Sequence, residues 1–351
     1  MTKQHKLQAA VIGSGKVGQI RCECIESHPD LELIAVCDSN PERVTNAGRK
    51  YYQDWHKVID LRPDLIFVCT TNEYISEIAV AALQAGIHTF CEKPPGRNVG
   101  DVQKIIKAEK KNPNLKLKFG FNHRYHQSVM DAKAIVEKQR LGKVLWMRGI
   151  YGKAGGPGYD KNWRNNPEHS GGGILIDQGI HMLDLFHLFT GKFDEVKSFI
   201  GSMYWKVRVE DNALAIMRNN RGQMAMIHSS ATQWKHTFVL DIYLERGYLS
   251  LYGILSTTMT YAPEYLKVAR CLYDEEGYPL PNPQESINYY DNDRSWILEV
   301  EEFVQCILED RAVRIGNSSD ALAAMELVQA IYKQDEKWEQ NRHMSAATEE
   351  I

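Results

Sequence analysis

Residues 7–38 read LQAAVIGSGKVGQIRCECIESHPDLELIAVCD. A short apolar run, Leu7–Ile12, leads into a glycine-rich turn at Gly13–Gly18, and a helix is predicted to follow that turn. A second apolar run, Leu31–Cys37, ends on Asp38. A strand, a Gly-x-Gly-x-x-Gly turn, a helix and a second strand that closes on an acid predict the start of a Rossmann dinucleotide-binding domain.

The glycines of this turn each meet a steric need. Gly13 allows the tight turn, Gly15 lets the backbone approach a pyrophosphate, and Gly18 lets the helix pack closely on the strand. The first turn of the helix presents free N–H groups and the positive end of its dipole to the phosphates. The residues predicted to contact the cofactor here are Gly13, Ser14, Gly15, Lys16, Val17 and Gly18.

Asp38 indicates which dinucleotide is bound. Its carboxylate can accept hydrogen bonds from both hydroxyls of the adenosine ribose, and it would repel a 2′-phosphate. We therefore expect NAD as the cofactor in preference to NADP. A competing interpretation is that Asp38 caps the next helix, because residues 38–42 read DSNPE and resemble a helix start.

The alternation of strands and helices continues to about residue 125. The predicted strands are Leu65–Cys69, His88–Cys91 and Leu117–Phe121, and the predicted helices are Tyr74–Ala85 and Val99–Lys111. Such alternation builds a parallel sheet with helices on its faces. We predict an α/β fold with an N-terminal Rossmann domain over residues 1–125.

From residue 126 the pattern changes to strand-like runs joined by short turns. Asn212–Arg218 and Gln223–Ala231 form one predicted hairpin, and Phe238–Glu245 and Tyr248–Tyr252 form another. The other predictions are helices at Ser128–Arg140, Ser295–Glu309 and Ser319–Lys333 and a polar loop at Asp274–Arg294. We predict a C-terminal α+β domain with an open, mainly antiparallel sheet over residues 126–340, followed by a frayed tail at 341–351.

Composition and charge exclude several classes of protein. The 351 residues carry a net charge of −3 at pH 7, so neither a nucleic-acid surface nor a basic membrane patch is expected. The apolar start of the chain runs straight into the glycine-rich turn, so we interpret it as a strand and not as a signal peptide. No window approaches the roughly 18 apolar residues of a membrane span. The seven cysteines are dispersed without a C-x-x-C pair, which favours reduced thiols in the cytoplasm and no metal site.

The motif Glu92-Lys93-Pro94 follows the predicted strand His88–Cys91. Ligands of open α/β sheets gather at the carboxyl ends of the strands. Lys93 can therefore project beside a nicotinamide. The competing interpretation is a charge pair in a surface turn.

Residues 171–184 read GGGILIDQGIHMLD. If one helix covers Ile174–Leu188, Asp177 and His181 stand at i and i+4 on one face, and Asp184 follows one turn later. Oxidation of an alcohol needs a base that takes the hydroxyl proton, and a histidine suits that role near neutral pH. The competing interpretation is a structural histidine.

Together these motifs resemble those of the Gfo/Idh/MocA oxidoreductases, the family of glucose–fructose oxidoreductase and inositol dehydrogenase. The matching motifs are the glycine-rich turn with Asp38, Glu92-Lys93-Pro94, Gly120-x-Asn122-x-Arg124, Leu141-Gly142-Lys143-Val144, Trp163-Arg164, Gly171-Gly172-Gly173 and Asp177-x-x-x-His181-x-x-Asp184. The resemblance implies a second domain whose open sheet forms homodimers or homotetramers.

The resemblance also implies roles for individual residues. Lys93 and His181 would be the catalytic pair, with His181 as general acid/base and Lys93 polarising the substrate oxygen, while Asp177 would bind a neighbouring hydroxyl. The further cofactor contacts would come from Thr70, Asn72, Glu92 and Lys93, and the substrate contacts from Asn122, Arg124, Trp163, Arg164, Asp177 and His181.

One departure from the family's pattern is visible. The family often has Thr-Pro-Asn-x-x-His after the fourth strand, whereas residues 70–75 read TTNEYI here, with Ile75 in place of the histidine. This puts the cofactor contacts of that loop in doubt, but not the class of reaction.

The expected function is NAD-dependent hydride transfer at a ring CH–OH of a sugar, sugar nucleotide or cyclitol. Tyr159, Lys161 and Arg164 slightly favour a sugar nucleotide, unless these cations are solvated loop charges. Two alternatives stay open: an NAD-dependent glycoside hydrolase of the same fold, and a non-catalytic sensor of NAD and a sugar. The presence of both Lys93 and His181 disfavours the sensor.

Overall fold

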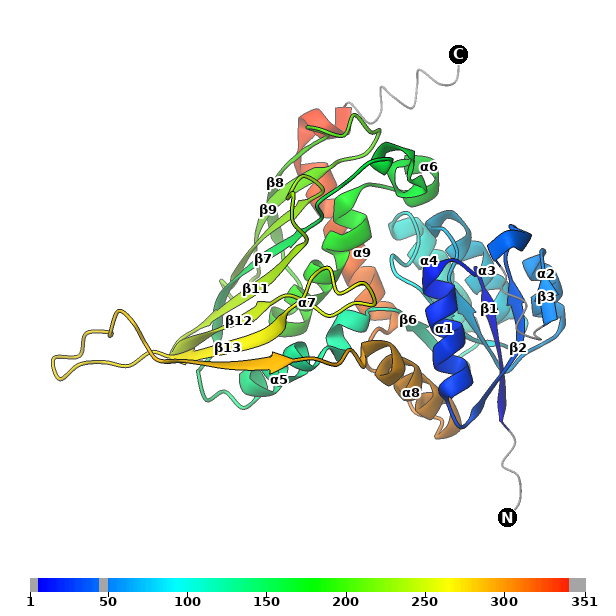
Figure 1. Cartoon of the computed structure of the whole chain (residues 1–351), viewed down its shortest axis with the longest axis horizontal. Helices are drawn as coiled ribbons and strands as arrows, with labels where there is room; N and C mark the ends of the chain where they lie inside the picture. The colour runs from blue at the N-terminus through cyan, green and yellow to red at the C-terminus, as the bar shows by residue number, and fades with distance from the viewer. Residues whose placement is uncertain (1–5, 44–49, 341–351) are drawn as a thin grey trace. The chain divides into compact units, whose positions relative to one another are not determined.

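The structure, a computed structural model, describes residues 6–43 and 50–340 (Figure 1). The chain divides into two compact units, and neither is one continuous stretch. The first unit comprises Met1–Asn122, Glu168–Gly171 and Ser295–Met325, and the second comprises His123–Pro167, Gly172–Arg294 and Glu326–Ile351. The predicted tail at 341–351 lies outside the described residues.

The first unit is built on a parallel sheet with the strand order β3-β2-β1-β4-β5-β6. Its strands are β1 (Leu7–Ile12), β2 (Leu31–Cys37), β3 (Lys50–Tyr52), β4 (Leu65–Val68), β5 (His88–Cys91) and β6 (Leu117–Phe119). Every neighbouring pair in this sheet is parallel. The strand order reverses between β1 and β4, which is the switch point of a Rossmann fold. The prediction of a Rossmann domain is therefore confirmed.

Two groups of helices accompany this sheet. One group consists of α1 (Lys16–Ser27), which contacts β1, β2 and β4, and α8 (Ser295–Leu308), which contacts α1. The other consists of α2 (Trp55–Asp60), α3 (Asn72–Gln84) and α4 (Val99–Lys111), which contact one another in sequence. The short strand β3 and the helix α2 were not predicted, because each is too brief to show a period.

A fully buried arginine lies between the sheet and the α1–α8 pair. Arg21 on α1 donates from Nε to Glu92 Oε1 at 2.7 Å and from Nη2 to Glu299 Oε2 at 2.6 Å. Its guanidinium stands 4.4 Å from the ring centre of Phe90 and 4.6 Å from that of Trp296. One cation thus faces two buried acids. Burial raises the pKa of Glu299 to about 7, despite the attraction of Arg21.

The second unit is built on a sheet with the strand order β14-β13-β12-β11-β7-β10-β9-β8. Its strands are β7 (Val144–Gly152), β8 (Glu195–Gly201), β9 (Asn212–Arg218), β10 (Met224–Ser230), β11 (Thr237–Leu244), β12 (Gly247–Tyr252), β13 (Glu264–Arg270) and β14 (Glu285–Tyr290). The pair β7–β10 is parallel, and the other neighbouring pairs are antiparallel. Both predicted hairpins, β9–β10 and β11–β12, are confirmed, as is the mainly antiparallel sheet.

The two faces of this sheet differ. Helices α5 (Gln127–Glu137) and α7 (Ile180–Thr190) pack on one face. The outward-pointing residues of the opposite face, which we call the outer face, include large exposed apolar side chains. These are Phe199, Leu214, Ile216, Met224 and Met226. Because alternate residues of β9 and β10 are buried, the exposed set is a property of the face and not of frayed strands.

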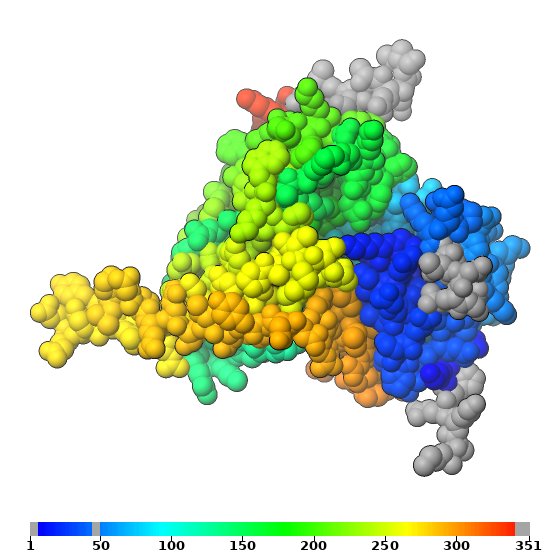
Figure 2. Space-filling model, in the orientation of Figure 1, coloured from blue at the N-terminus to red at the C-terminus, as the bar shows by residue number. Residues whose placement is uncertain are grey.

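The predicted loop at Asp274–Arg294 is partly wrong. Its second half contains β14, which pairs with β13 at the edge of the sheet. β14 reads ESINYY and is exposed along almost its whole length, so it lacks the buried alternation that reveals a strand in a sequence. The preceding residues 272–282 are exposed and stand clear of the sheet, as the yellow to orange extension in Figures 1 and 2 shows.

The buried cluster around Arg21 predicts a specific pH dependence of stability. Glu299 has a pKa near 7 in the folded protein and an ordinary, lower pKa when unfolded. The folded state therefore holds an extra proton between these values, and this group's contribution to stability falls as pH rises from about 5 to 8. Glu299→Gln should remove that contribution, so its stability relative to wild type should rise by up to about 1.4 kcal/mol per pH unit.

Thermal unfolding at several pH values measures this difference. Glu195→Gln is the matched control, since Glu195 pairs with Arg218 at the surface with its side chain 65% exposed. A stability difference between Glu299→Gln and wild type that stays constant from pH 5 to 8 would contradict the assignment.

Candidate functional site

The glycine-rich turn of the first unit has the geometry that the sequence predicts. A Cβ on Gly13, whose φ is +98°, would stand 2.5 Å from the Cys69 carbonyl oxygen, and a Cβ on Gly18 would stand 1.8 Å from that of Gly13. A Cβ on Gly15, in contrast, would meet no atom of residues 6–43 and 50–340 within 4 Å. Helix α1 begins directly after Gly15 with no side chain capping its first N–H groups. The turn therefore leaves backbone donors and open space for an anionic ligand.

Asp38 ends strand β2 beside this turn and is almost fully buried. Its Oδ2 accepts from the Ser14 N–H at 2.8 Å, and its Oδ1 accepts from the Asn40 N–H at 2.9 Å. The carboxylate therefore holds the glycine-rich turn and also caps the turn after β2. The contact of Asp38 with a cofactor ribose stays a prediction.

Two further predicted cofactor residues follow strand β4. The Thr70 hydroxyl is buried, and among the described residues it has no hydrogen-bond partner. Asn72 has one, because its Nδ2 donates to the Ser170 carbonyl oxygen at 2.8 Å. A buried hydroxyl without a partner beside an open glycine-rich turn fits a site whose remaining partner is a ligand.

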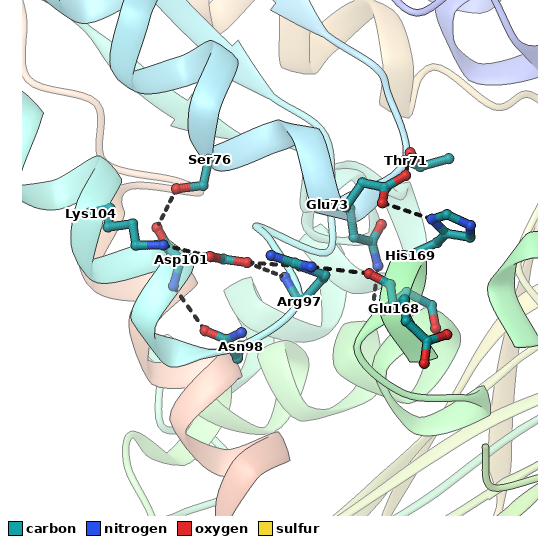
Figure 3. A network of polar contacts seen from close by, with 11 residues as sticks. Thr71, Glu73, Ser76, Arg97, Asn98, Asp101, Lys104, Glu168 and His169 are labelled. Carbon is teal, nitrogen blue, oxygen red and sulfur yellow. Dashed lines mark hydrogen bonds and ion pairs between the residues drawn. The ribbon is translucent and has the colours of Figure 1, made fainter. Parts of the chain in front are cut away.

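A polar network holds residues 168–171 on the same unit (Figure 3). Arg97 donates from Nη1 to the Glu168 carbonyl oxygen at 3.1 Å and from Nε to Asp101 Oδ2 at 3.4 Å. His169 Nδ1 lies 2.7 Å from Glu73 Oε2. The loop that departs from the family's pattern thus makes a contact of its own through Glu73.

The motif Glu92-Lys93-Pro94 lies at the carboxyl end of β5. Glu92 is held by Arg21 and by its own N–H, which donates to the Val68 carbonyl oxygen at 2.9 Å. Lys93 is half-buried and follows directly, and the Lys93–Pro94 peptide bond is cis. Asn122, predicted to contact substrate, is buried in this unit and donates from Nδ2 to Ser295 Oγ at 3.2 Å. The carboxyl ends of β1, β2, β4 and β5 therefore carry the predicted cofactor residues.

The second unit contains the other predicted site residues, on a helix that differs from the prediction. The first turn, η5 (Leu175–Gly179), is a π-helix, and α7 follows it. One regular α-helix over residues 174–188 is therefore wrong at its start. The wider turn is set from outside the helix: Glu210, a buried acid, accepts from the Gly173 N–H at 2.8 Å and from the Leu175 N–H at 2.9 Å. Turns of this kind are frequent at functional sites.

The three polar residues of the motif, Asp177, His181 and Asp184, each contact different side chains. Asp184 is fully buried and accepts from Arg124 Nε at 2.7 Å and from Arg124 Nη2 at 2.6 Å. Arg124, predicted to contact substrate, is thus part of a buried ion pair. His181 is also buried, and its ring stacks on that of His123 with centres 3.6 Å apart.

His123 extends this stack to a tyrosine. Its Nε2 lies 3.0 Å from the Tyr151 hydroxyl oxygen, and burial raises the pKa of Tyr151. His181 therefore belongs to a row of polar rings. His123 was not singled out from the sequence, because nothing in its local pattern distinguishes it from the residues around it.

Asp177 is the centre of an ion-pair cluster. Its Oδ2 lies 2.5 Å from Lys153 Nζ, and its Oδ1 accepts from Arg164 Nε at 3.0 Å. The Arg164 guanidinium in turn lies 4.5 Å from the centre of the Trp163 ring. Asp177, Trp163 and Arg164 were predicted together and lie together. Lys153 was missed, although it directly follows strand β7.

Two family models match this chain. The model described as oxidoreductase family, NAD-binding Rossmann fold, matches residues 7–121, and the GFO/IDH/MocA C-terminal domain matches residues 129–250. The chain therefore belongs to the Gfo/Idh/MocA family of oxidoreductases, and the resemblance inferred from the motifs is confirmed.

Individual relatives agree with this family. D-glucoside 3-dehydrogenase of Escherichia coli is 26% identical over 348 residues, which cover 94% of this chain and 95% of that protein. Inositol 2-dehydrogenase of Salmonella paratyphi B is 26% identical over 270 residues, which cover 74% and 78%. The solved structure of a levoglucosan dehydrogenase with NADH and levoglucosan matches with a TM-score of 0.84 at 20% identity, covering 95% of this chain and 98% of that one. This last match shows a shared fold.

None of the helices in residues 6–43 and 50–340 has the length and apolar composition needed to span a bilayer. No group of three or more His, Cys, Asp or Glu side chains in these ranges could hold a metal ion.

The glycine-rich turn generates a paired test. Gly15→Ala should fold normally, because its Cβ meets no atom of the described part of the chain within 4 Å. It should weaken NADH binding by about tenfold or more by filling the space left for the pyrophosphate. Gly18→Ala should also lower the melting temperature, because its Cβ overlaps the Gly13 carbonyl. NADH fluorescence titration and thermal melting measure both effects. Unchanged NADH affinity in a folded Gly15→Ala protein would contradict this placement.

Proposed function

We propose that the protein is an NAD-dependent dehydrogenase or reductase that acts on a ring CH–OH or C=O group of a sugar or cyclitol. The observation that carries this proposal is the open glycine-rich turn at Gly15 in a chain of an oxidoreductase family. Beside this turn lies the buried hydroxyl of Thr70, which has no hydrogen-bond partner among the described residues. The names of the relatives, a glucoside and an inositol dehydrogenase, favour the substrate class.

In this proposal the cofactor would be held by the first unit. Gly13–Gly18 and the first N–H groups of α1 would bind the pyrophosphate, and Thr70 and Asn72 would line its other side. Asp38 favours NAD over NADP, because a 2′-phosphate beside its carboxylate would be repelled. NAD, when bound, supplies the acceptor for a hydride.

The chain's own residues would then move the proton and place the substrate. As the C–H bond breaks and C=O forms, His181 takes the hydroxyl proton, and it returns that proton in the reverse direction. Lys93 orients the reacting oxygen and polarises it. Asp177 binds a neighbouring hydroxyl, with Lys153 and Arg164 holding its carboxylate in place. Trp163, Asn122 and Arg124 would complete or support the substrate pocket.

The cluster at Asp177 bears on the class of substrate. Arg164 is engaged by Asp177, and its charge is therefore partly neutralised. Lys161 is exposed. These contacts weaken the argument for a phosphate-bearing sugar nucleotide, so we favour an uncharged sugar or cyclitol.

The catalytic roles are tested by two substitutions and two controls. Lys93→Ala and His181→Ala should each lower kcat by about 10²–10⁴-fold while the protein still binds NADH. Exposed residues of the same types serve as controls: Lys107→Ala and His56→Ala should retain activity. The assay follows absorbance at 340 nm with inositols, hexoses and methyl glucosides as substrates.

The outcomes separate the proposal from its alternatives. Turnover lost only in the Lys93 and His181 variants supports the catalytic pair. NADH binding without net turnover of any substrate would overturn the proposal. Release of free sugar from an aryl glycoside would then identify a hydrolase, and its absence a sensor.

We further propose that residues 1–125 serve the cofactor and residues 126–340 serve the substrate and a homodimer or homotetramer contact. The exposed apolar side chains of the outer face support the oligomer, because such faces are usually buried against a partner. Thiols at Cys37, Cys69, Cys91, Cys271 and Cys306 are compatible with the proposed cytoplasmic location.

Disruption of the outer face tests the oligomer. Ile216 is 59% exposed at the middle of this face and lies opposite Met226 on the neighbouring strand. Ile216→Lys should shift the protein toward the monomer mass of 40.2 kDa in light scattering, because a buried lysine without a partner opposes association. Leu61→Lys, an exposed apolar residue of the first unit, is the control. A wild-type protein of monomer mass would overturn this proposal.

A further inference from the structure

Four aromatic side chains of the second unit form a continuous group, which we call the aromatic platform: Tyr159, Tyr204, Trp205 and Trp234. Trp205 is central, with ring centres at 4.9 Å to Tyr159, 5.0 Å to Tyr204 and 6.1 Å to Trp234. Tyr204 and Trp234 are 4.9 Å apart. The rings come from three separate connections, which lie after β7, between β8 and β9, and between β10 and β11.

Two of the four rings of the platform are exposed, and the other two, Tyr159 and Trp205, are half-buried. Trp234 is 60% exposed and Tyr204 is 58% exposed. Aromatic rings gain most when both of their faces are covered, and a cluster of exposed rings is a mark of a recognition surface.

The platform is held rigid by a buried acid. Asp211 is fully buried, and its carboxylate accepts from the N–H groups of Met203, Tyr204 and Trp205 at 2.8, 2.8 and 3.0 Å. Trp205 Nε1 donates to the Ala231 carbonyl oxygen at 2.8 Å. Three N–H donors on one carboxylate fix the loop before any ligand arrives, which lowers the entropy cost of binding.

The backbone adapts to the platform at two positions. Gly155 packs so closely on Trp205 that a Cβ there would stand 2.0 Å from the indole ring. Trp234 itself has a φ of +55°, a conformation that costs a non-glycine residue about 1 kcal/mol. Strain of this kind is retained at functional sites when the surrounding structure enforces it.

Residues 159–165 link the platform to the cluster at Asp177. Tyr159 lies at its near end, where burial and the negative charge of Asp177 together raise the pKa of the phenol. The Asn165 side chain donates to the Tyr159 carbonyl oxygen, and Asn165 is the neighbour of Arg164, which is bonded to Asp177. A ligand that reaches Asp177 can therefore extend over these rings.

We propose that the aromatic platform binds a second pyranose ring, so that the substrate is a disaccharide whose oxidised ring lies at Asp177. This inference rests on the proposed function and narrows its substrate class. A pyranose has an apolar face of C–H groups and a polar rim. That face matches the exposed ring of Trp234, which stands edge-on to Tyr204 and tilted to Trp205. Stacking on an aromatic ring removes that apolar face from water.

The test compares a monosaccharide with disaccharides in wild type and in Trp234→Ala. With NAD, kcat/KM for the preferred member of cellobiose, maltose, sucrose and trehalose should exceed that for glucose by about tenfold. Trp234→Ala should abolish this preference and leave kcat/KM for glucose within about twofold. Trp234→Phe should retain most of the preference, because it keeps an aromatic face. Tyr278→Ala, at a ring 66% exposed outside the platform, is the control.

Binding is also measured without turnover, by quenching of tryptophan fluorescence. Quenching by a disaccharide, lost in Trp234→Ala, supports the platform even if NAD is never reduced, in which case only the proposed function fails. If the kcat/KM values for glucose and all four disaccharides lie within twofold of one another and no quenching is seen, the proposed role of the platform is overturned. The proposed function then stays intact. The proposed role of the platform is also overturned if Trp234→Ala lowers kcat/KM equally for glucose and the disaccharide. A change in the mass of the oligomer in this variant would overturn it as well.

Discussion

The contact on which the first unit depends is the guanidinium of Arg21. It is fully buried, bonded to Glu92 and Glu299, and enclosed by Phe90 and Trp296. A buried cation is tolerated only when it is paired with acids, so the helix after the glycine-rich turn, the end of β5 and helix α8 must all be in place together. Glu92 is the residue before Lys93. The same ion pair that closes the core therefore fixes the start of the proposed catalytic motif.

The second unit relies on buried carboxylates that bind backbone N–H groups. Glu210 holds the start of η5, and its neighbour Asp211 holds the loop of Tyr204 and Trp205. Two adjacent residues therefore organise two features: Glu210 holds the turn that carries Asp177, and Asp211 holds the loop of the aromatic platform. Burial raises the pKa of Glu210, and its three hydrogen bonds, including one from the Tyr332 hydroxyl at 2.8 Å, oppose that shift. The positions of the proposed site residues are set here by buried acids that bind backbone N–H groups.

Features set by nearby residues could be predicted from the sequence. The glycine-rich turn, Asp38 at the end of β2 and the two hairpins each depend on a short stretch whose pattern is complete in itself. The family resemblance added the grouping of Trp163, Arg164 and Asp177. It did not supply the ion pairs that these residues make.

Features set by distant residues could not be predicted. The π-helical turn depends on Glu210, which is more than thirty residues away in the chain. Lys153 can be recognised as a site residue only through its contact with Asp177. Strand β14 is formed by pairing with β13, and its own residues carry no apolar alternation. Asp211 and Trp234 belong to separate connections that only the fold brings to one place. In each case the missing information is the identity of a partner, not the propensity of the local sequence.

The discontinuity of the first unit has a consequence for how the protein is made. Arg21 and Glu92 leave the ribosome early, but Glu299 follows about two hundred residues later. At synthesis rates of about 5–20 residues per second, the wait lasts roughly 10–40 s. Throughout that interval the nascent Rossmann unit lacks α8, and its arginine lacks one of its two acids. The whole sheet of the second unit, residues 144–290, is translated before α8, so the first unit begins first but is completed only after that sheet has been made.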